Sequence, residues 1–188
     1  MPTTNFKAGG TFASVDDASG ATWGTPENAG ASDDLYANAS AGASPNHTDF
    51  LRITNFGFTA SDIPSGSLIN GIEVSIERAE TNTGSGNDRT IILRKTSGQI
   101  GDNKATATTW PSTDNTANYG GATDTWNAGL LDSDIVSADF GIDISADRAS
   151  GSVSFRVDYV SIAVTYTELN IRNIYTVTNQ AVMRAATR

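Results

Sequence analysis

The residue types that carry most enzyme chemistry are scarce in this sequence. Cysteine is absent and histidine occurs once, as His47. These counts exclude a disulfide framework, a thiol nucleophile, a thiolate metal site and any site that needs two imidazoles. His47 stands in a polar run beside Asp49. An exposed loop histidine explains this setting better than the base of a catalytic triad.

Carboxylates are the most abundant reactive groups, and they cluster in turn-like stretches. The clusters are Asp16 with Asp17, Asp33 with Asp34, and Asp132 with Asp134. A glycosidase needs two carboxylates that face each other across a cleft, and neighbours within a turn do not establish that arrangement. We therefore predict no catalytic residues and no enzyme activity.

Calcium is the metal that these aspartates would suit, because it prefers oxygen ligands. Asp132, Ser133 and Asp134 form one candidate ligand group, and Asn87 with Asp88 forms another. Aspartate is also a common turn former and helix cap, which accounts for the same residues without an ion. We predict no metal site and no cofactor.

The three tryptophans, Trp23, Trp110 and Trp126, all lie in loop-like stretches. Exposed indole faces would form a platform on which a sugar could stack, which is one function open to this chain. The other interpretation is that the rings plug the ends of the fold and hold the long loops down. We favour the plug and keep sugar binding through these tryptophans as the alternative.

Apolar and polar residues alternate along several stretches of the chain, so we expect β-strands to support these loops. Ile72, Val74 and Ile76 alternate with Glu73, Ser75 and Glu77, a pattern typical of an antiparallel strand with one wet face. Similar patterns predict strands over 12–15, 35–40, 50–58, 90–95, 140–144 and 153–166. In the last of these, apolar parity switches after Tyr159, so we expect a bulge or bend there.

The fold class follows from these strands and from a composition rich in turn-forming residues. We predict an all-β protein, a single antiparallel β-sandwich of jelly-roll type with long loops and a C-terminal extension. Residues 1–11 are expected to be an arm, 12–168 the sandwich and 169–188 the extension. The long region 96–134 should hold a short strand or a helical turn, such as one near Asp132–Ile135 capped by Asp132 or Ser133.

The charge of the chain limits the classes of molecule that it is expected to bind. The formal net charge is −9, which disfavours nucleic acid and anionic membranes. No apolar run reaches the roughly 18 residues of a membrane helix, and the first residues lack the features of a signal peptide. The charge is uneven, because residues 169–188 contain three arginines and no acid. The remaining nine basic and 21 acidic side chains leave the body at −12.

The C-terminal segment 169–188 is therefore a candidate binding arm. It combines β-forming apolar residues with basic ones, and an uncovered segment of this kind would expose apolar surface. It either folds back as an extra strand or adds to a neighbouring subunit or particle protein, and we favour the second. The candidate partner-binding residues are Ile171, Arg172, Ile174, Tyr175, Val177, Arg184 and Arg188.

Several stretches resemble a module of structural proteins from tailed-bacteriophage and prophage virions. They are Trp23–Ala29, Ala31–Ala37, Thr54–Phe58, Ile63–Gly66, Ile69–Ile72, Asp139–Ile142, Val157–Val160 and Val164–Tyr166. The resemblance implies a jelly-roll-like sandwich without catalytic residues, located in the virion after synthesis in the bacterial cytoplasm. It leads us to expect a capsid decoration (cement) protein or a tail or head-fibre component that binds other virion proteins and copies of itself. A carbohydrate-binding module is the alternative.

Overall fold

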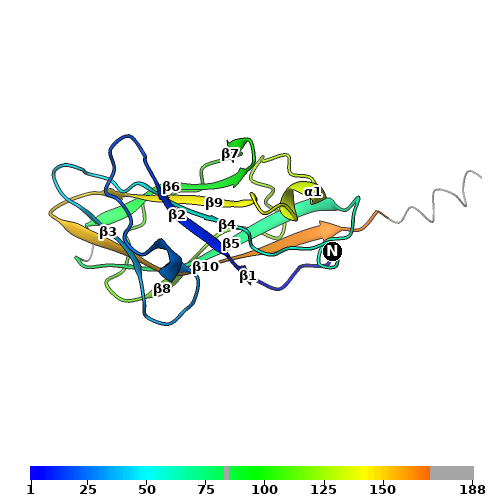
Figure 1. The fold of residues 1–188 in the computed structure, drawn as a ribbon, viewed down its shortest axis with the longest axis horizontal. Helices are drawn as coiled ribbons and strands as arrows, with labels where there is room; N and C mark the ends of the chain where they lie inside the picture. The colour runs from blue at the N-terminus through cyan, green and yellow to red at the C-terminus, as the bar shows by residue number, and fades with distance from the viewer. Residues whose placement is uncertain (83–84, 170–188) are drawn as a thin grey trace, which may run out of the picture.

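Two antiparallel sheets pack face to face in the computed structural model, which describes residues 1–82 and 85–169 (Figure 1). The first sheet has the order β1–β10–β5–β8, and β3 also pairs with β10. Its strands are β1 (Lys7–Ala8), β3 (Ala37–Ala41), β5 (Leu68–Glu80), β8 (Asn115–Gly121) and β10 (Val153–Thr167).

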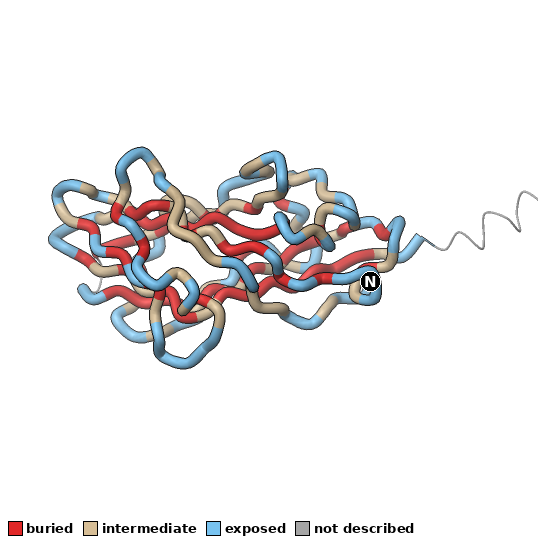
Figure 2. The backbone as a smooth tube through the Cα atoms, in the orientation of Figure 1, coloured by how far each residue is buried: buried red, intermediate tan, exposed pale blue. Residues whose placement is uncertain are grey.

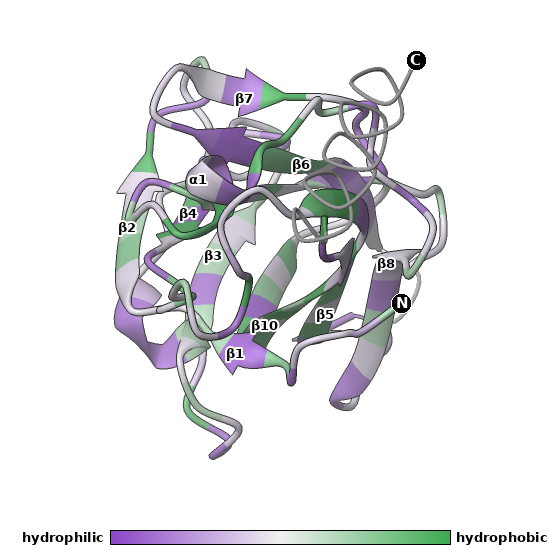
Figure 3. Ribbon diagram, turned by 90° about the vertical axis from the view of Figure 1, so that its right-hand side faces the viewer, coloured by the Kyte–Doolittle hydropathy of each residue, from purple (hydrophilic) through white to green (hydrophobic). Residues whose placement is uncertain are grey.

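The second sheet has the order β2–β4–β9–β6–β7. Its strands are β2 (Thr11–Val15), β4 (Phe50–Thr54), β6 (Gly86–Lys95), β7 (Gly98–Ile100) and β9 (Gly141–Arg148). The described helices are short: η1 (Pro26–Ala29) and α1 (Asp132–Ile135). Figure 3 views the two layers end on. The predicted all-β antiparallel sandwich is confirmed.

The core lies between the sheets, where the inward faces of the strands meet. Figure 2 shows the buried backbone running along the central strands and the exposed backbone in the loops. In β5, Ile72, Val74 and Ile76 have no exposed surface, whereas Glu73 and Glu77 are half-buried on the other face. The predicted register of this strand is therefore confirmed, because a slip by one residue would exchange the two faces.

The parity change in β10 has the cause that the sequence indicates. Pairing with β5 runs from Val157↔Arg78 to Tyr159↔Glu77, so Asp158 is an extra residue in a β-bulge. Before the bulge Phe155 and Val157 are buried, and after it the buried set resumes at Val160. The bulge turns Asp158 out of the ladder, with consequences for the site described below.

The long region between β6 and β9 contains more structure than a helical turn. It holds β7, β8 and α1, and β8 forms one edge of the first sheet. The helical turn lies at 132–135 as expected, but its N-cap position is Leu131 rather than Asp132 or Ser133. The Asp134 carboxylate accepts the Leu131 N–H at 3.0 Å, which satisfies one free donor of the first turn.

Most predicted strand bounds shift by a few residues, and two predicted segments change more. The strand expected over 50–58 ends at Thr54, because Asn55 (φ 58°) and Gly57 (φ 66°) adopt left-handed backbone conformations that a strand cannot continue. The arm expected over 1–11 is part of the sheet instead. Lys7 and Ala8 pair with β10, and Thr3 forms a bridge to Thr165, so backbone hydrogen bonds hold this segment against the last strand.

The candidate partner-binding residues of the C-terminal segment, Ile171 to Arg188, lie outside the described residues. Within residues 1–82 and 85–169, no helix is long and apolar enough to span a membrane.

Candidate functional site

The tryptophans are buried, with exposed fractions of 2% for Trp23 and 0% for Trp110 and Trp126. Each indole N–H donates within the fold. Trp23 reaches the Asp49 carbonyl at 2.7 Å, Trp110 the Asp88 carboxylate at 2.8 Å and Trp126 the Ile72 carbonyl at 2.9 Å. A sugar could not stack on these rings without opening the core, so a platform built from them is not available.

Asp88 is the centre of a buried polar cluster at one end of the sandwich. Its carboxylate accepts hydrogen bonds from Arg78, the Trp110 indole, the Tyr119 hydroxyl at 2.9 Å and both the N–H and Oγ1 of Thr106 at 3.1 Å. Burial raises the pKa of Tyr119 far above its ordinary value and keeps the hydroxyl protonated as a donor. Because protein donors occupy the Asp88 oxygens, this cluster fixes the loop before β8 rather than holding calcium.

The other sequence candidates are also engaged within the fold. Asp132 accepts the Gly66 N–H at 2.9 Å, and Asp134 pairs with Lys95 at 3.1 Å. His47 Nε2 lies 2.7 Å from the Asp17 carbonyl, and its Nδ1 lies 3.0 Å from the Asn46 side chain. Among the described residues His47 has no serine or threonine hydroxyl as hydrogen-bond partner, so the geometry offers no triad.

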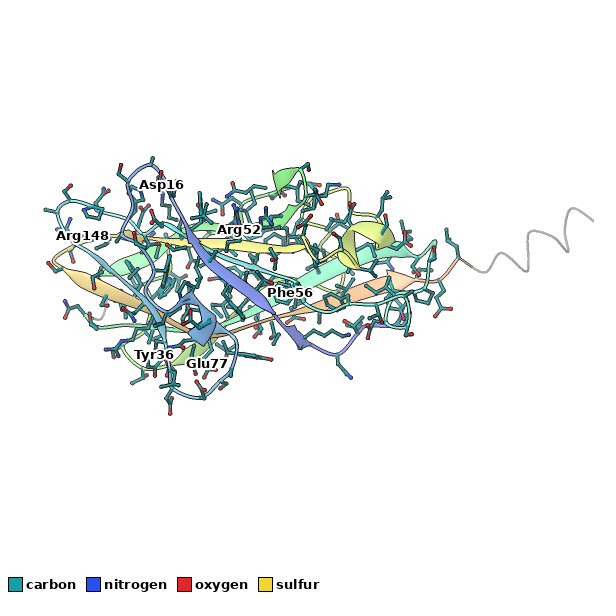
Figure 4. All side chains as sticks on the ribbon, viewed as in Figure 1. Asp16, Tyr36, Arg52, Phe56, Glu77 and Arg148 are labelled. Atoms are coloured by element: carbon teal, nitrogen blue, oxygen red, sulfur yellow. The ribbon has the colours of Figure 1, made fainter. Side chains whose placement is uncertain are left out.

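A pocket of about 470 Å³ lies on the outer face of the first sheet, where β3 pairs with β10. The loop that follows η1 forms its other wall, and Figure 4 shows Tyr36 on this lower side of the molecule. Its lining combines one aromatic ring with many hydrogen-bonding groups: Thr25, Asn28, Asp34, Leu35, Tyr36, Asn38, Ser154 and Arg156.

The Tyr36 backbone holds the pocket wall together. Its carbonyl oxygen accepts hydrogen bonds from Thr25 Oγ1 at 3.0 Å, Asn28 Nδ2 at 3.3 Å and Asn38 Nδ2 at 3.4 Å. The first two donors lie at the start of and within η1, whereas Asn38 lies on β3 and pairs with Arg156 of β10. Three side chains, two from η1 and its start and one from β3, thus converge on one acceptor, which fixes the shape of the pocket before any ligand binds.

Two neighbouring side chains orient the Tyr36 ring. Its hydroxyl donates to Asp114 Oδ2 at 2.5 Å, and the Arg156 guanidinium carbon lies 5.4 Å from the ring centroid. The hydrogen bond to Asp114, with smaller effects of burial and of the same carboxylate's charge, raises the pKa of Tyr36 to about 12. Tyr36 is therefore a protonated and oriented ring at ordinary pH.

Three carboxylates meet beside this ring. Oxygens of Asp34, Asp114 and Asp158 all lie within 4.8 Å of one another. Asp158, the bulged residue of β10, is 1% exposed and accepts the N–H groups of Asp33 and Asp34 at 3.4 and 3.3 Å. Burial raises the pKa of the Asp158 carboxyl above its ordinary value, and the charges of Glu77 and Asp114 add to the effect.

Arg156 is the cation of the pocket, and its donors are unused. Of the nine basic side chains in the described residues, only Arg148 and Arg156 form no ion pair, and Arg148 donates to the Gly151 carbonyl. The Arg156 side chain makes no hydrogen bond within the same described residues. A guanidinium with free N–H groups at a pocket wall is able to donate to a ligand.

Comparison with known proteins gives structural neighbours alone. No family model and no curated protein matches the chain. Among solved structures, "BiXyn10A CBM1 APO" is 13% identical with a TM-score of 0.43, covering 82% of this chain and 90% of that one. "CBM4 structure and function" is 10% identical with a TM-score of 0.38, covering 86% of this chain and 94% of that one. The CtCBM11 solution structure is 18% identical with a TM-score of 0.31, covering 86% of this chain and 98% of that one.

The expected virion function finds no support in any of these comparisons. The three structures are carbohydrate-binding modules, none is a virion protein, and no comparison connects the chain to a phage particle. The prediction of a capsid decoration, tail or head-fibre protein is therefore corrected. The scores reflect a shared arrangement of strands, so they do not indicate where this chain binds a ligand or which one.

Sequence reasoning missed the residues of the pocket. In the sequence Tyr36 is only an aromatic residue near the acidic pair Asp33 and Asp34, and Arg156 is only a polar residue within an alternating strand pattern. No local signal joins them, because the contact of Asn38 with Arg156 depends on pairing between β3 and β10.

Proposed function

We propose that this chain is a non-catalytic carbohydrate-binding module that holds a glycan in the Tyr36 pocket. The observation that carries the proposal is the pocket itself: an open cavity of about 470 Å³ whose wall offers an aromatic ring and unused hydrogen-bonding groups. Sugars present apolar C–H faces and many hydroxyls, so a ring combined with convergent polar groups is a complementary surface.

The arrangement suits binding better than catalysis. Tyr36 is oriented by Asp114 and is a protonated phenol, which disfavours a role as a base. The carboxylates of Asp34, Asp114 and Asp158 lie together on one side, whereas glycoside hydrolysis needs two carboxylates on opposite sides of the bond. The chemistry that these groups offer is therefore hydrogen bonding and stacking.

Affinity electrophoresis and calorimetry against soluble polysaccharides test this proposal. The panel is glucan, xylan, mannan and galactan. We expect retention by at least one polymer and about a tenfold loss of affinity in Tyr36→Ala, the loss of one aromatic contact. Tyr36→Phe keeps the ring and removes the hydroxyl that Asp114 orients, so it should fall between the two.

A matched asparagine pair provides the control. Asn38→Ala removes a polar group of the pocket wall and should weaken binding, whereas Asn118→Ala changes an exposed asparagine on β8, at the opposite edge of the same sheet. Binding by Asn118→Ala should equal that of the unchanged protein. Failure to bind every polymer, or unchanged binding by Tyr36→Ala, would refute the proposal.

A further inference from the structure

The Tyr36 pocket has unused acceptors as well as unused donors. Asn28 and Asn38 each use an N–H on the Tyr36 carbonyl, and their Oδ1 atoms accept no hydrogen bond within the described residues. The Asp34 carboxylate, which also lines the pocket, likewise accepts none there. The free donors are the guanidinium N–H groups of Arg156 and the second amide N–H of each asparagine. A ligand must therefore supply hydrogen-bond donors to the oxygens as well as acceptors to the N–H groups, which a sugar hydroxyl does and a carboxylate does not.

The charges around the pocket favour a ligand that carries no negative charge. Arg156 is the one basic residue that lines it, whereas Asp34 lines it and Asp114 and Asp158 lie within 4.8 Å of Asp34 at the level of their oxygens. Among residues 1–82 and 85–169, no lysine or arginine lies within 4.0 Å of these three carboxylates to neutralise them. The local charge is negative within a protein of net charge −9.

We infer that the pocket takes neutral, hydroxyl-rich sugars and rejects the same sugars when they carry a carboxylate or sulfate. The inference rests on the proposed function and names the ligand class of that site. Each hydroxyl of a neutral sugar donates one hydrogen, which suits the acceptors of Asn28, Asn38 and Asp34. A carboxylate or sulfate offers acceptors only, and the neighbouring aspartates repel it.

Asp34 is the specificity-determining residue in this account. It is the exposed member of the three aspartates and lines the pocket, so its charge acts on the ligand with the least protein in between. Arg156 has the opposite role, because its free N–H groups donate to ring and hydroxyl oxygens of the sugar. Discrimination between neutral and acidic sugars depends on the balance between one cation and three carboxylates.

A chemically matched ligand pair tests the inference. Calorimetry compares the best-binding neutral hexose polymer with the same polymer oxidised at C6, so that a primary hydroxyl becomes a carboxylate. If only xylan binds, the acidic form is xylan with glucuronate branches. At low salt we expect the acidic form to bind on the order of tenfold more weakly, and the difference should shrink as salt screens the charges.

Two variants assign the effect to the pocket. Asp34→Asn removes one charge and keeps an acceptor, and asparagine tolerates the left-handed conformation of this position (φ 65°). It should bring the two affinities closer together, so the measured quantity is the ratio of the neutral-polymer affinity to the acidic-polymer affinity. Asp16→Asn removes the same charge from a loop on the other side of the molecule (Figure 4) and should leave the ratio unchanged.

The outcomes separate this inference from the proposed function. Equal binding of both forms, preference for the acidic form, or a ratio that Asp34→Asn and Asp16→Asn change alike would overturn the inference and leave glycan binding in place. No binding of any neutral or acidic polymer would overturn both.

Discussion

Two polar regions of this molecule use the same residue types in opposite ways. The cluster around Asp88 joins an acid, Arg78, Trp110 and Tyr119 inside the sandwich, and the protein's own donors occupy the carboxylate. The Tyr36 pocket joins acids, an arginine and a tyrosine at the surface, and Arg156 and Asp34 keep free groups.

The difference shows how structural and binding polar groups are told apart. A buried carboxylate without partners would be costly, so the fold completes the coordination of Asp88. An exposed group can exchange hydrogen bonds with water until a ligand replaces the water, so the free groups of the pocket carry little cost.

Asp88→Ala should lower the free energy of unfolding most, because it leaves the Arg78 charge buried without its carboxylate. The expected loss in the free energy of unfolding is about 3–5 kcal/mol, measured by urea denaturation. Asp34→Asn in the pocket, which keeps a residue that tolerates the left-handed backbone of this position (φ 65°), should change stability by less than about 0.5 kcal/mol. If the two variants are equally stable, the contrast between the regions is wrong.

Ile76→Ala extends the contrast to apolar residues. Ile76 has no exposed surface between the sheets, so its truncation should cost about 2–5 kcal/mol through lost burial and a residual cavity. Leu35 is 58% exposed at the pocket, so Leu35→Ala should lower the free energy of unfolding by less than about 0.5 kcal/mol. Urea midpoints at equal slopes measure both, and a large loss in Leu35→Ala would mean that the pocket wall is part of the core.

Acid titration should affect two aspartates in opposite directions. Hydrogen bonds from Lys7 and then Thr59 lower the pKa of Asp62, so its contribution to stability is present above its ordinary pKa and is lost as the pH falls. Burial raises the pKa of Asp158, so the fold favours its neutral form; that contribution is present at low pH and is lost as the pH rises through the folded pKa.

Unfolding free energies measured against pH should separate these two groups. Asp62→Asn should flatten the loss of stability in acid, whereas Asp158→Asn should steepen it, because the variant no longer gains from protonation at that position. Carboxyl resonances followed by NMR should place the Asp158 midpoint above that of Asp62. The reverse order would contradict the surroundings described for these groups.

Tyr36 should show the smallest effect, confined to alkaline pH. Its ionisation, followed by ultraviolet absorbance, should have a pKa of about 12. Because the raised pKa favours the neutral phenol in the folded state, the associated stability is complete below the ordinary value of 10.0 and is lost as the pH rises through the folded pKa. Asp114→Asn should lower the Tyr36 pKa, and an unchanged value would show that Asp114 does not orient this ring.

The sequence by itself determined which faces of the long strands point into the core. Alternation in β5 marks Ile72, Val74 and Ile76 as inward-facing, and the parity change in β10 marks the bulge, because side chains of a strand point to opposite faces in turn. Absent cysteine and a single histidine also excluded whole classes of site. These are local or compositional properties, and no knowledge of strand partners is needed to infer them.

The tertiary structure alone decided which polar groups are free. In the sequence, Trp110 in a loop could be a platform or a plug, and its burial on Asp88 settles this. Asn38 and Arg156 become neighbours only when β3 pairs with β10, and the loop after η1 then closes the pocket with Tyr36. The physical reason is that a side chain's partners depend on contacts between distant segments, which local periodicity does not encode.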